Sequence, residues 1–462
     1  MRRSASFSRN FTEGSILKKL LLFALPFMAS NALQVFYALV DMVIVGNFVG
    51  SYGLSAVSVA SQITTFSTML CLGFSTGGQV YIAQLTGVGQ KERINRTIGT
   101  MFASLALLAG VFTLTILILR TPILQLMHTP PESFSMALDY LTICGVGTVF
   151  TFGYNVVSAV LRGMGDSRHP FLFILIASVV NLLLDIVFTG GLGWGVSGAA
   201  AATIIGQGVS FLFAILYLYK NRGAFGFDFR RDSFKIQPDI LKTLSGLGIP
   251  FAIQSCAINI SMIFVNSLVN QAGVHASAAF GVGVKLDDIV TKVSQGIMHA
   301  ASPMIGQNFA AGKRDRIKKI VKWTFLITAA MYTVFVLIYI PFCKEMFGLF
   351  THAPEVIALA PVFVSAIVWS FPGLAVMRAM GSFVQGIGNA KLMMVLGILD
   401  GFAARILLSY TIGIVLGLGL YGFILGYGLA CYAFAIPASL YFFSGVWKNR
   451  RSLVERKCEE KG

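Results

Sequence analysis

Twelve apolar stretches in this sequence are each long enough to cross a lipid bilayer as a helix. A spanning helix needs about 20 mostly apolar residues. None of the stretches alternates apolar and polar residues with the period of two that a membrane barrel requires. Their predicted limits are Leu20–Phe48, Leu54–Leu85, Ile98–Leu119, Met136–Leu161, Pro170–Phe188, Trp194–Tyr219, Leu247–Val269, Ala276–Ile305, Trp323–Phe342, Ile357–Val384, Leu392–Leu416 and Leu420–Phe443. The pattern predicts an all-α polytopic membrane protein with twelve transmembrane helices.

The composition agrees with a membrane protein. Of 462 residues, 56% are hydrophobic and only 12% are charged, and the mean hydropathy is +0.78. Soluble domains carry roughly twice that charged fraction. The six cysteines form no close pair in the sequence, so neither a disulfide framework nor a metal site is expected.

Basic residues precede the first stretch, as they do in a secretory signal peptide. They are Arg2, Arg3, Arg9, Lys18 and Lys19. However, the apolar run continues well beyond the roughly 7–15 residues of a signal-peptide core, and no convincing cleavage site follows it. We therefore interpret this segment as the first membrane span.

Lysine and arginine are concentrated in alternate loops between the stretches. The second, fourth, sixth, eighth and tenth loops carry Lys91, Arg93, Arg96; Arg162, Arg168; Lys220, Arg222, Arg230, Arg231, Lys235; Lys313, Arg314, Arg316, Lys318, Lys319; and Lys391. The tail adds Lys448, Arg450, Arg451, Arg456 and Lys457, whereas the other loops are nearly bare, with Arg120 and Lys344 at helix ends. Because cytoplasmic loops carry the excess of basic residues, we expect a plasma-membrane protein with both termini in the cytoplasm.

The sequence also repeats itself at a displacement of 223 residues. Gln84-x4-Gly89-x3-Arg93-Ile94 recurs as Gln307-x4-Gly312-x3-Arg316-Ile317, and Pro131-Glu132 and Gly163-x-Gly165 recur as Pro354-Glu355 and Gly386-x-Gly388. Each half holds six spans, an even number, so the two lobes share one orientation and are related by a pseudo-two-fold axis along the membrane normal. The predicted domains are an N-terminal lobe (1–219), a cytoplasmic linker (220–242) and a C-terminal lobe (243–462).

Motifs of soluble enzymes do not fit their surroundings. The strings Gly193-x-Gly195-x-x-Gly198 and Gly417-x-Gly419-x-x-Gly422 open membrane spans rather than following a strand, so they do not indicate a dinucleotide site. The GxSxG string that begins at Gly73 lies inside the second span, where no nucleophile elbow can form. The five histidines have no HExxH spacing. We expect no enzyme activity and no cofactor.

The first acidic residue at membrane depth is Asp41. Gln34, Tyr37 and Asp41 are spaced by three and four residues and share one face of the first span. The flanking residues are aliphatic, so this carboxyl group has no sequence-local cation. A carboxyl group in that setting is a candidate to accept a proton. The alternative is a buried carboxylate held by hydrogen bonds from a neighbouring helix.

A second polar pair lies in the fifth span. Asn181 and Asp185 are four residues apart among aliphatic neighbours, and their side-chain oxygens could coordinate a cation. The alternative is a polar clamp between helices, which is worth roughly 0.6 kcal/mol in membranes.

The second half does not repeat these acids. At the repeat displacement, Asp41 corresponds to Phe264 and Asp185 to Leu408, so a coupling site is expected in the first lobe. The eighth span has charges of its own: Lys285, Asp287, Asp288 and Lys292. Lys285–Asp288 and Asp288–Lys292 are spaced to pair along one face, so we interpret the group as a self-neutralised structural cluster. The roles of Arg378, Asp400 and Arg405 stay open, between lining a cleft and pairing with one another.

Several of these motifs together resemble the multidrug and toxic compound extrusion (MATE) family. They are Leu39-Val40-Asp41, Arg162-Gly163-Met164-Gly165-Asp166-Ser167, Asn181-x3-Asp185, Gly198-Ala199-Ala200-Ala201-Ala202-Thr203 and the two Gln-x4-Gly loops. The resemblance covers essentially the whole chain. It implies a V-shaped pair of six-helix lobes that exports amphipathic, often cationic compounds in exchange for H⁺ or Na⁺ by alternating access. The resemblance also implies small-molecule substrates and membrane lipid as partners, and no nucleic acid. It implies that the protein is a monomer.

The acids resemble those of the branch whose ion site lies in the N-terminal lobe. In that branch Asp41, Asn181, Asp185 and Thr203 match the ion-coupling positions, with Na⁺ as a possible ligand. Three more residues match the lobe's polar cavity: Gln34, Tyr37 and Asn155. Gln254 and Asn259 stand in the seventh span, which lacks the acid of the other branch, while Lys285, Asp287 and Asp288 depart in part from the family pattern.

A flippase for lipids or lipid-linked oligosaccharides is the alternative function, because an apolar cleft also suits lipids. Such a flippase would be expected to line its cavity with cationic side chains that hold phosphates, whereas the acids here favour cations. The sequence leaves open which compounds are exported and whether H⁺ or Na⁺ drives export.

Overall fold

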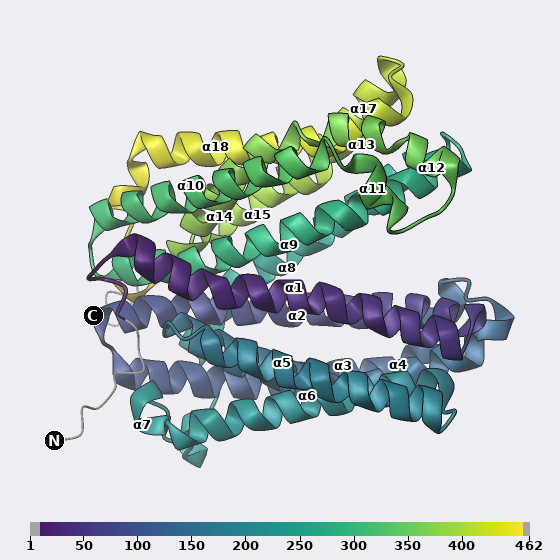
Figure 1. The fold of residues 1–462 in the computed structure, drawn as a ribbon. Helices are drawn as coiled ribbons and strands as arrows, with labels where there is room; N and C mark the ends of the chain where they lie inside the picture. The colour runs from purple at the N-terminus through teal and green to yellow at the C-terminus, as the bar shows by residue number, and fades with distance from the viewer. Residues whose placement is uncertain (1–9, 456–462) are drawn as a thin grey trace. The chain divides into compact units, whose positions relative to one another are not determined.

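The computed structural model describes residues 10–455, and every regular element within that range is a helix (Figure 1). The first six predicted spans correspond to α1 (Ile16–Phe48), α2 (Ser51–Val88), α3 (Lys91–Leu126), α4 (Pro131–Gly163), α5 (Arg168–Asp185) continued by η1 (Ile186–Gly191), and α6 (Gly195–Lys220). Short helices α7 (Arg222–Phe225) and η2 (Arg231–Phe234) follow.

The last six predicted spans correspond to a second series of helices. They are α8 (Pro238–Asn270), α9 (Val274–Ala310), α10 (Arg314–Tyr339), α12 (Pro354–Ala358) with α13 (Ala360–Ile367) and α14 (Ser370–Gly386), α15 (Ala390–Ile398) with η3 (Leu399–Ala404), α16 (Arg405–Tyr410) and η4 (Thr411–Val415), and α17 (Gly419–Leu429) with α18 (Cys431–Ser444). The connections α11 (Cys343–Gly348) and η5 (Val446–Asn449) complete the described elements.

Length and hydropathy support a membrane fold for these helices. In the described range, ten helices can cross a bilayer, or eleven if Pro354–Ile367 and Ser370–Gly386 count as one bent span. The remaining one is α9, which carries the four charged residues noted above. The predicted all-α, twelve-helix architecture in two six-helix lobes is therefore confirmed.

The tenth span is bent, which the sequence analysis did not predict. Its two parts meet at an angle of 51° around Val368 and Trp369. Pro372 follows one turn later and has no N–H to donate to the Val368 carbonyl, so the helical ladder is interrupted there.

Two compact units make up the chain. One contains residues 29–249, and the other contains Phe11–Met28 together with residues 250–455. Helix α1 therefore begins in the second unit and continues in the first, and α8 does the reverse. The predicted lobes divide the chain at 219 and 243 instead.

In the first unit α4 packs against α2, α3 and α6, and α5 packs against α6 (Figure 1). Its buried core gathers aliphatic and small residues around Val45, Leu124, Leu141 and Val196. In the second unit α14 packs against α9, α10 and α18, and Phe371 and Ala375 of α14 are buried with Val290 and Tyr332. A separate core of this unit includes Phe280, Phe347 and Phe363.

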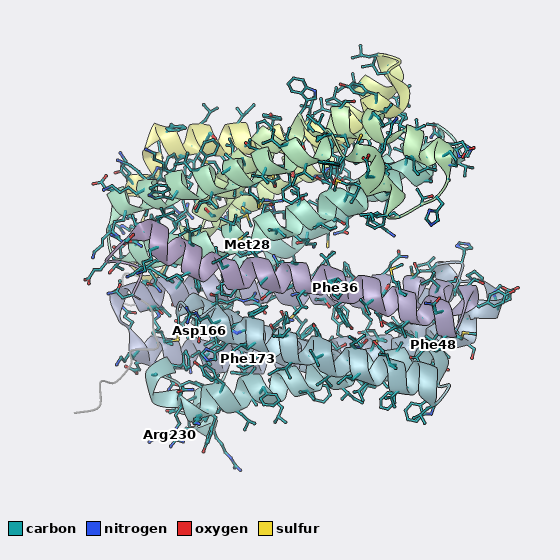
Figure 2. The ribbon with its side chains drawn as sticks, in the orientation of Figure 1. Met28, Phe36, Phe48, Asp166, Phe173 and Arg230 are labelled. Carbon is teal, nitrogen blue, oxygen red and sulfur yellow. The ribbon has the colours of Figure 1, made fainter. Side chains whose placement is uncertain are left out.

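The start of α5 is fixed by the aspartate of the Arg162–Ser167 motif, which Figure 2 labels near Phe173. Asp166 Oδ1 accepts hydrogen bonds from the main-chain N–H groups of Arg168 (3.1 Å) and His169 (3.2 Å). Its other oxygen lies 2.6 Å from His169 Nδ1 and accepts a hydrogen bond from the Tyr217 hydroxyl of α6 (3.2 Å). Asp166 thus caps α5 and joins it to α6.

Within the second unit, side chains of α9 and α10 hold the main chain of residues 11–15, which we call the N-terminal strap. Gln307 Oε1 accepts a hydrogen bond from the Phe11 N–H at 2.9 Å. Arg316 Nη2 donates to the carbonyl oxygens of Phe11, Glu13 and Gly14, each at 3.1 Å. The Phe11 side chain is fully buried, with its ring centroid 4.9 Å from that of Phe23.

The linker packs on α3 of the first unit in a comparable way. Asn95 accepts a hydrogen bond from the Asp228 N–H and donates one to the Ser233 hydroxyl, both at 3.3 Å. Arg93 lies 3.7 Å from the Asp239 carboxylate. The basic residues that entered the topology prediction at the chain ends lie outside the described residues: Arg2, Arg3, Arg9, Arg456 and Lys457.

Candidate functional site

The polar residues predicted in the first span lie on α1, whose length Met28, Phe36 and Phe48 mark in Figure 2. The Tyr37 hydroxyl is 3.3 Å from Thr203 Oγ1 of α6. Asp41, one turn further, interacts with Asp185 of α5. Because Tyr37 and Asp41 are four residues apart, both side chains point from α1 toward α5 and α6.

The fifth and sixth spans complete this arrangement. Asn181 and Asp185 are buried, with 3% and 1% of their surface exposed. Asn181 Nδ2 donates a hydrogen bond of 3.4 Å to Thr203 Oγ1, so the threonine hydroxyl meets side chains from both α1 and α5. Asp41, Tyr37, Asn181, Asp185 and Thr203 form one cluster within the first unit, which we call the acidic cluster.

Several oxygen atoms in the acidic cluster have no hydrogen-bond partner. They are Asp41 Oδ1, Asn181 Oδ1 and both carboxylate oxygens of Asp185, all inaccessible to solvent. Buried polar groups are normally paired. Four convergent oxygen atoms without donors form a set that a proton or a small cation would satisfy.

Glycine and a wide helical turn position these side chains. A Cβ atom at Gly206 of α6 would lie 2.9 Å from the Ala177 carbonyl oxygen and 3.1 Å from Asn181 Cβ, so only glycine lets α5 approach this closely. Asp185 stands where the α-helix changes to the π-helical η1. Such turns occur often at functional sites, because they redirect one side chain without ending the helix.

Two residues near the acidic cluster were missed by the sequence analysis. Tyr140 and Cys144 of α4 are buried, contact each other and interact electrostatically with Asp41. They are four residues apart in an apolar span, the same spacing that drew attention to Asn181 and Asp185. That spacing could have indicated a shared helix face, but tyrosine and cysteine are common in apolar helices, so their spacing alone does not predict a functional site.

Two predicted cavity residues lie outside the hydrogen bonds of the acidic cluster. Asn155 donates its amide to the Thr151 carbonyl of its own helix at 2.8 Å. Gln34 is exposed on α1. The described residues contain no group of three or more histidine, cysteine or acidic side chains arranged to hold a metal ion.

The charged residues of the eighth span lie on two faces of α9, and of the four only Asp287 stands apart from the face along which the others were predicted to pair. Lys285, Asp288 and Lys292 share the exposed face of α9. Asp287 points the other way and is buried, and it interacts with Arg378 and Arg405. A spacing of one residue turns a helical side chain by about 100°, so neighbours in sequence need not share a face.

Comparison with known proteins gives a consistent result across both halves. The family model MatE matches residues 26–187 and 250–411. A probable multidrug resistance protein of Bacillus subtilis, YpnP, is 31% identical over 450 residues, which cover 97% of this chain and 99% of that protein. The probable multidrug resistance protein NorM of Thermotoga maritima is 24% identical over 97% of this chain and 96% of its own length.

Solved structures share the fold. An outward-facing multidrug resistance MATE family transporter of the MOP superfamily has a TM-score of 0.90 and 22% identity, covering 96% of this chain and 99% of the other. A MOP superfamily transporter from Pyrococcus furiosus gives 0.90 and 21%, with 97% and 100% covered. The two-copy family match and the full-length relative together show that this chain belongs to the MatE family of membrane transporters and is not an enzyme.

Proposed function

We propose that this protein is a secondary active antiporter that exports amphipathic, often cationic organic compounds in exchange for H⁺ or Na⁺ by alternating access. Its family membership supports export, since relatives in Bacillus subtilis and Staphylococcus aureus are named multidrug resistance or multidrug export proteins. We further propose that it acts as a monomer in the plasma membrane with both termini in the cytoplasm, as the basic even-numbered loops predict.

The main support for the proposed ion coupling is the set of buried oxygen atoms in the acidic cluster that have no hydrogen-bond partner. Asp41 and Asp185 interact with each other in a buried setting, where two ionised carboxylates repel. A proton on one of them, or Na⁺ between them, removes that repulsion and satisfies the orphaned oxygen atoms. Asp41, Asn181, Asp185 and Thr203 supply oxygen ligands of the kind that Na⁺ accepts.

Competition for this site would couple the two transported species. A cationic substrate and the coupling ion are both attracted to the same pair of acids, so binding of one favours release of the other. The acidic cluster draws side chains from α1, α5 and α6, and a change in its charge acts on all three helices at once.

The test is dye efflux from proteoliposomes under an imposed pH gradient or an imposed Na⁺ gradient. Asp41→Asn, Asp185→Asn and the double variant are compared with Asp139→Asn, an exposed acid on α4 of the same unit. Each cluster variant is expected to lose gradient-driven efflux, and the double variant should be little worse than the worse single one, because both acids serve one site. Asp139→Asn should transport like the wild type.

Two results would contradict the proposal. Losses that multiply in the double variant, with an unchanged ion dependence of the remaining efflux, would show that the acids act separately. Transfer of labelled lipid between leaflets, without efflux of a cationic dye, would favour the flippase instead. Melting temperatures measured alongside separate loss of coupling from loss of folding.

A further inference from the structure

An exposed apolar stripe of α6 ends at basic residues. Leu212, Leu216 and Tyr219 are spaced by four and three residues and therefore share one face of the helix. Their exposed fractions are 54%, 53% and 52%. We call these three residues the α6 stripe. Lys220 follows directly and is exposed, so the surface changes from apolar to basic at the end of the helix.

Aromatic contacts bring part of the linker back to this end of α6. The Arg222 guanidinium stands 5.2 Å from the ring centroid of Tyr219, and the Phe229 ring centroid lies 5.2 Å from that of Tyr219. Arg230, the next residue, is exposed, and Figure 2 labels it at the linker end of α6. Arg222 and Arg230 are eight residues apart in the sequence, yet both stand beside the end of the α6 stripe.

The linker backbone around Phe229 is held in an unusual conformation. Phe229 has a φ of 56°, in the left-handed region that bulky residues rarely adopt. The Asp228 N–H donates to Asn95 Oδ1 of α3 at 3.3 Å. Asp228 Oδ1 accepts hydrogen bonds from the Arg230 N–H at 3.1 Å and from the Ser233 hydroxyl at 2.6 Å. These bonds fix the main chain at Arg230 before any ligand binds, which lowers the entropic cost of binding.

Basic side chains outnumber acids on this surface. Four of them are exposed, and we call them the basic group: Lys220, Arg222, Arg230 and Arg231. Among residues 10–455, only Arg230 of the four has a carboxylate within 4 Å, with its Nε 4.0 Å from Asp228 Oδ2. Such a long, exposed pair is weak. The neighbouring acid, Asp232, is paired with Lys235 at 2.7 Å, so the basic group keeps a net positive charge.

We propose that the basic group and the α6 stripe together bind an anionic phospholipid from the membrane leaflet on the linker side. The phosphate lies against the basic group, where each arginine can donate two hydrogen bonds to phosphate oxygens. An acyl chain lies along the α6 stripe. Clusters of four to eight basic residues directly after a spanning helix are typical of anionic-lipid sites.

The two features together select this class of ligand. A water-soluble phosphate would use only the basic group, and a lipid without net charge would use only the α6 stripe. An anionic phospholipid uses both, because its charge and its acyl chains adjoin as the two surfaces do. This site is independent of the antiport proposed above.

The test is photochemical labelling of the full-length protein in lipid nanodiscs. Two lipid probes carry the same diazirine-bearing acyl chain, one with a phosphatidylglycerol head group and the other with a phosphatidylcholine head group. Mass spectrometry of peptides locates the adducts. We expect the phosphatidylglycerol probe to label residues 212–219 several-fold more than the phosphatidylcholine probe, since each basic side chain at a membrane surface strengthens anionic-lipid binding about five-fold.

Variants of the basic group test its part in this preference. Arg222→Gln/Arg230→Gln should remove most of the preference for phosphatidylglycerol at residues 212–219. The control is Lys319→Gln/Lys322→Gln, which removes two exposed lysines of α10 and the same net charge, and it should keep the preference. Melting temperatures measured alongside report folding. Should the double arginine variant fail to fold, each single variant is measured instead and should lower the preference about five-fold.

Competition separates the two sources of phosphate. Excess unlabelled phosphatidylglycerol should reduce labelling of residues 212–219, whereas inorganic phosphate at constant ionic strength should leave it unchanged. Competition by inorganic phosphate would assign the basic group to a soluble anion and overturn the lipid site. Equal labelling by the two probes, or equal losses of preference in the two double variants, would also overturn it.

Discussion

Replacing Gly206 by alanine tests whether close approach of α5 and α6 builds the acidic cluster. The new Cβ would lie 2.9 Å from the Ala177 carbonyl oxygen and 3.1 Å from Asn181 Cβ. Ordinary contacts begin at 3.4 Å, so the two helices must separate by several tenths of an ångström. The hydrogen bond between Asn181 and Thr203, already 3.4 Å long, is then lost.

The expected cost combines three contributions. Overpacking in a tight core costs about 1–3 kcal/mol, and a lost interhelical hydrogen bond in a membrane costs roughly 0.6 kcal/mol. The better helix propensity of alanine returns up to about 1 kcal/mol. Gly206→Ala is therefore expected to destabilise the protein by about 1–3 kcal/mol and to impair gradient-driven efflux.

Gly208, two residues further along α6, provides the matched control. Its Cβ would meet Phe150 ring atoms at 3.8 Å, an ordinary contact, so Gly208→Ala should be neutral or slightly stabilising. Thermal unfolding of both purified variants in detergent, followed by proteoliposome efflux, makes the comparison. Equal melting temperatures and equal efflux for the two variants would refute the role of this close approach.

Two further predictions concern the segments that precede α1 and α8. Gly99→Ala should displace the linker from α3, because its Cβ would overlap a main-chain oxygen of the linker. Gly110→Ala, with open space around the new Cβ, should leave the linker in place. Trypsin should therefore cleave after Arg230 faster in Gly99→Ala than in Gly110→Ala, and equal cleavage rates would contradict the packing of the linker on α3. Arg316→Gln removes three hydrogen bonds to the N-terminal strap and should lower the free energy of unfolding by about 1–3 kcal/mol. Lys318→Gln, which loses one exposed ion pair, is the control. Equal melting temperatures of the two variants would contradict a stabilising role of the strap.

The twelve spans were predictable because each depends on the composition of a continuous stretch. Breaks within a span depend on local backbone geometry, and only some of them leave a signal in the sequence. Pro372 lies in the predicted tenth span and gave a signal for its bend that the sequence analysis did not use. The π-helical turn after Asp185 has no comparable signature, because its residues also fit an ordinary helix.

The acidic cluster was predictable in part for a related reason. Asp41 and Asp185 stand out as lone acids among aliphatic residues, and spacing along one helix gives their face. Contacts across helices depend on how each helix is rotated about its axis, which the sequence does not reveal. That is why Tyr140 was missed, and why Arg405 could be matched with Asp400 only in the structure.

The N-terminal strap is recognised as peptide backbone rather than as an amino-acid sequence. Gln307 and Arg316 bind N–H and C=O groups that every residue except proline provides in full. Substitutions at Thr12 or Glu13 therefore leave the recognised atoms in place, whereas an inserted or deleted residue shifts all of them out of register. The hydrogen bonds therefore constrain the length of this segment more than the identity of its residues, apart from the buried Phe11.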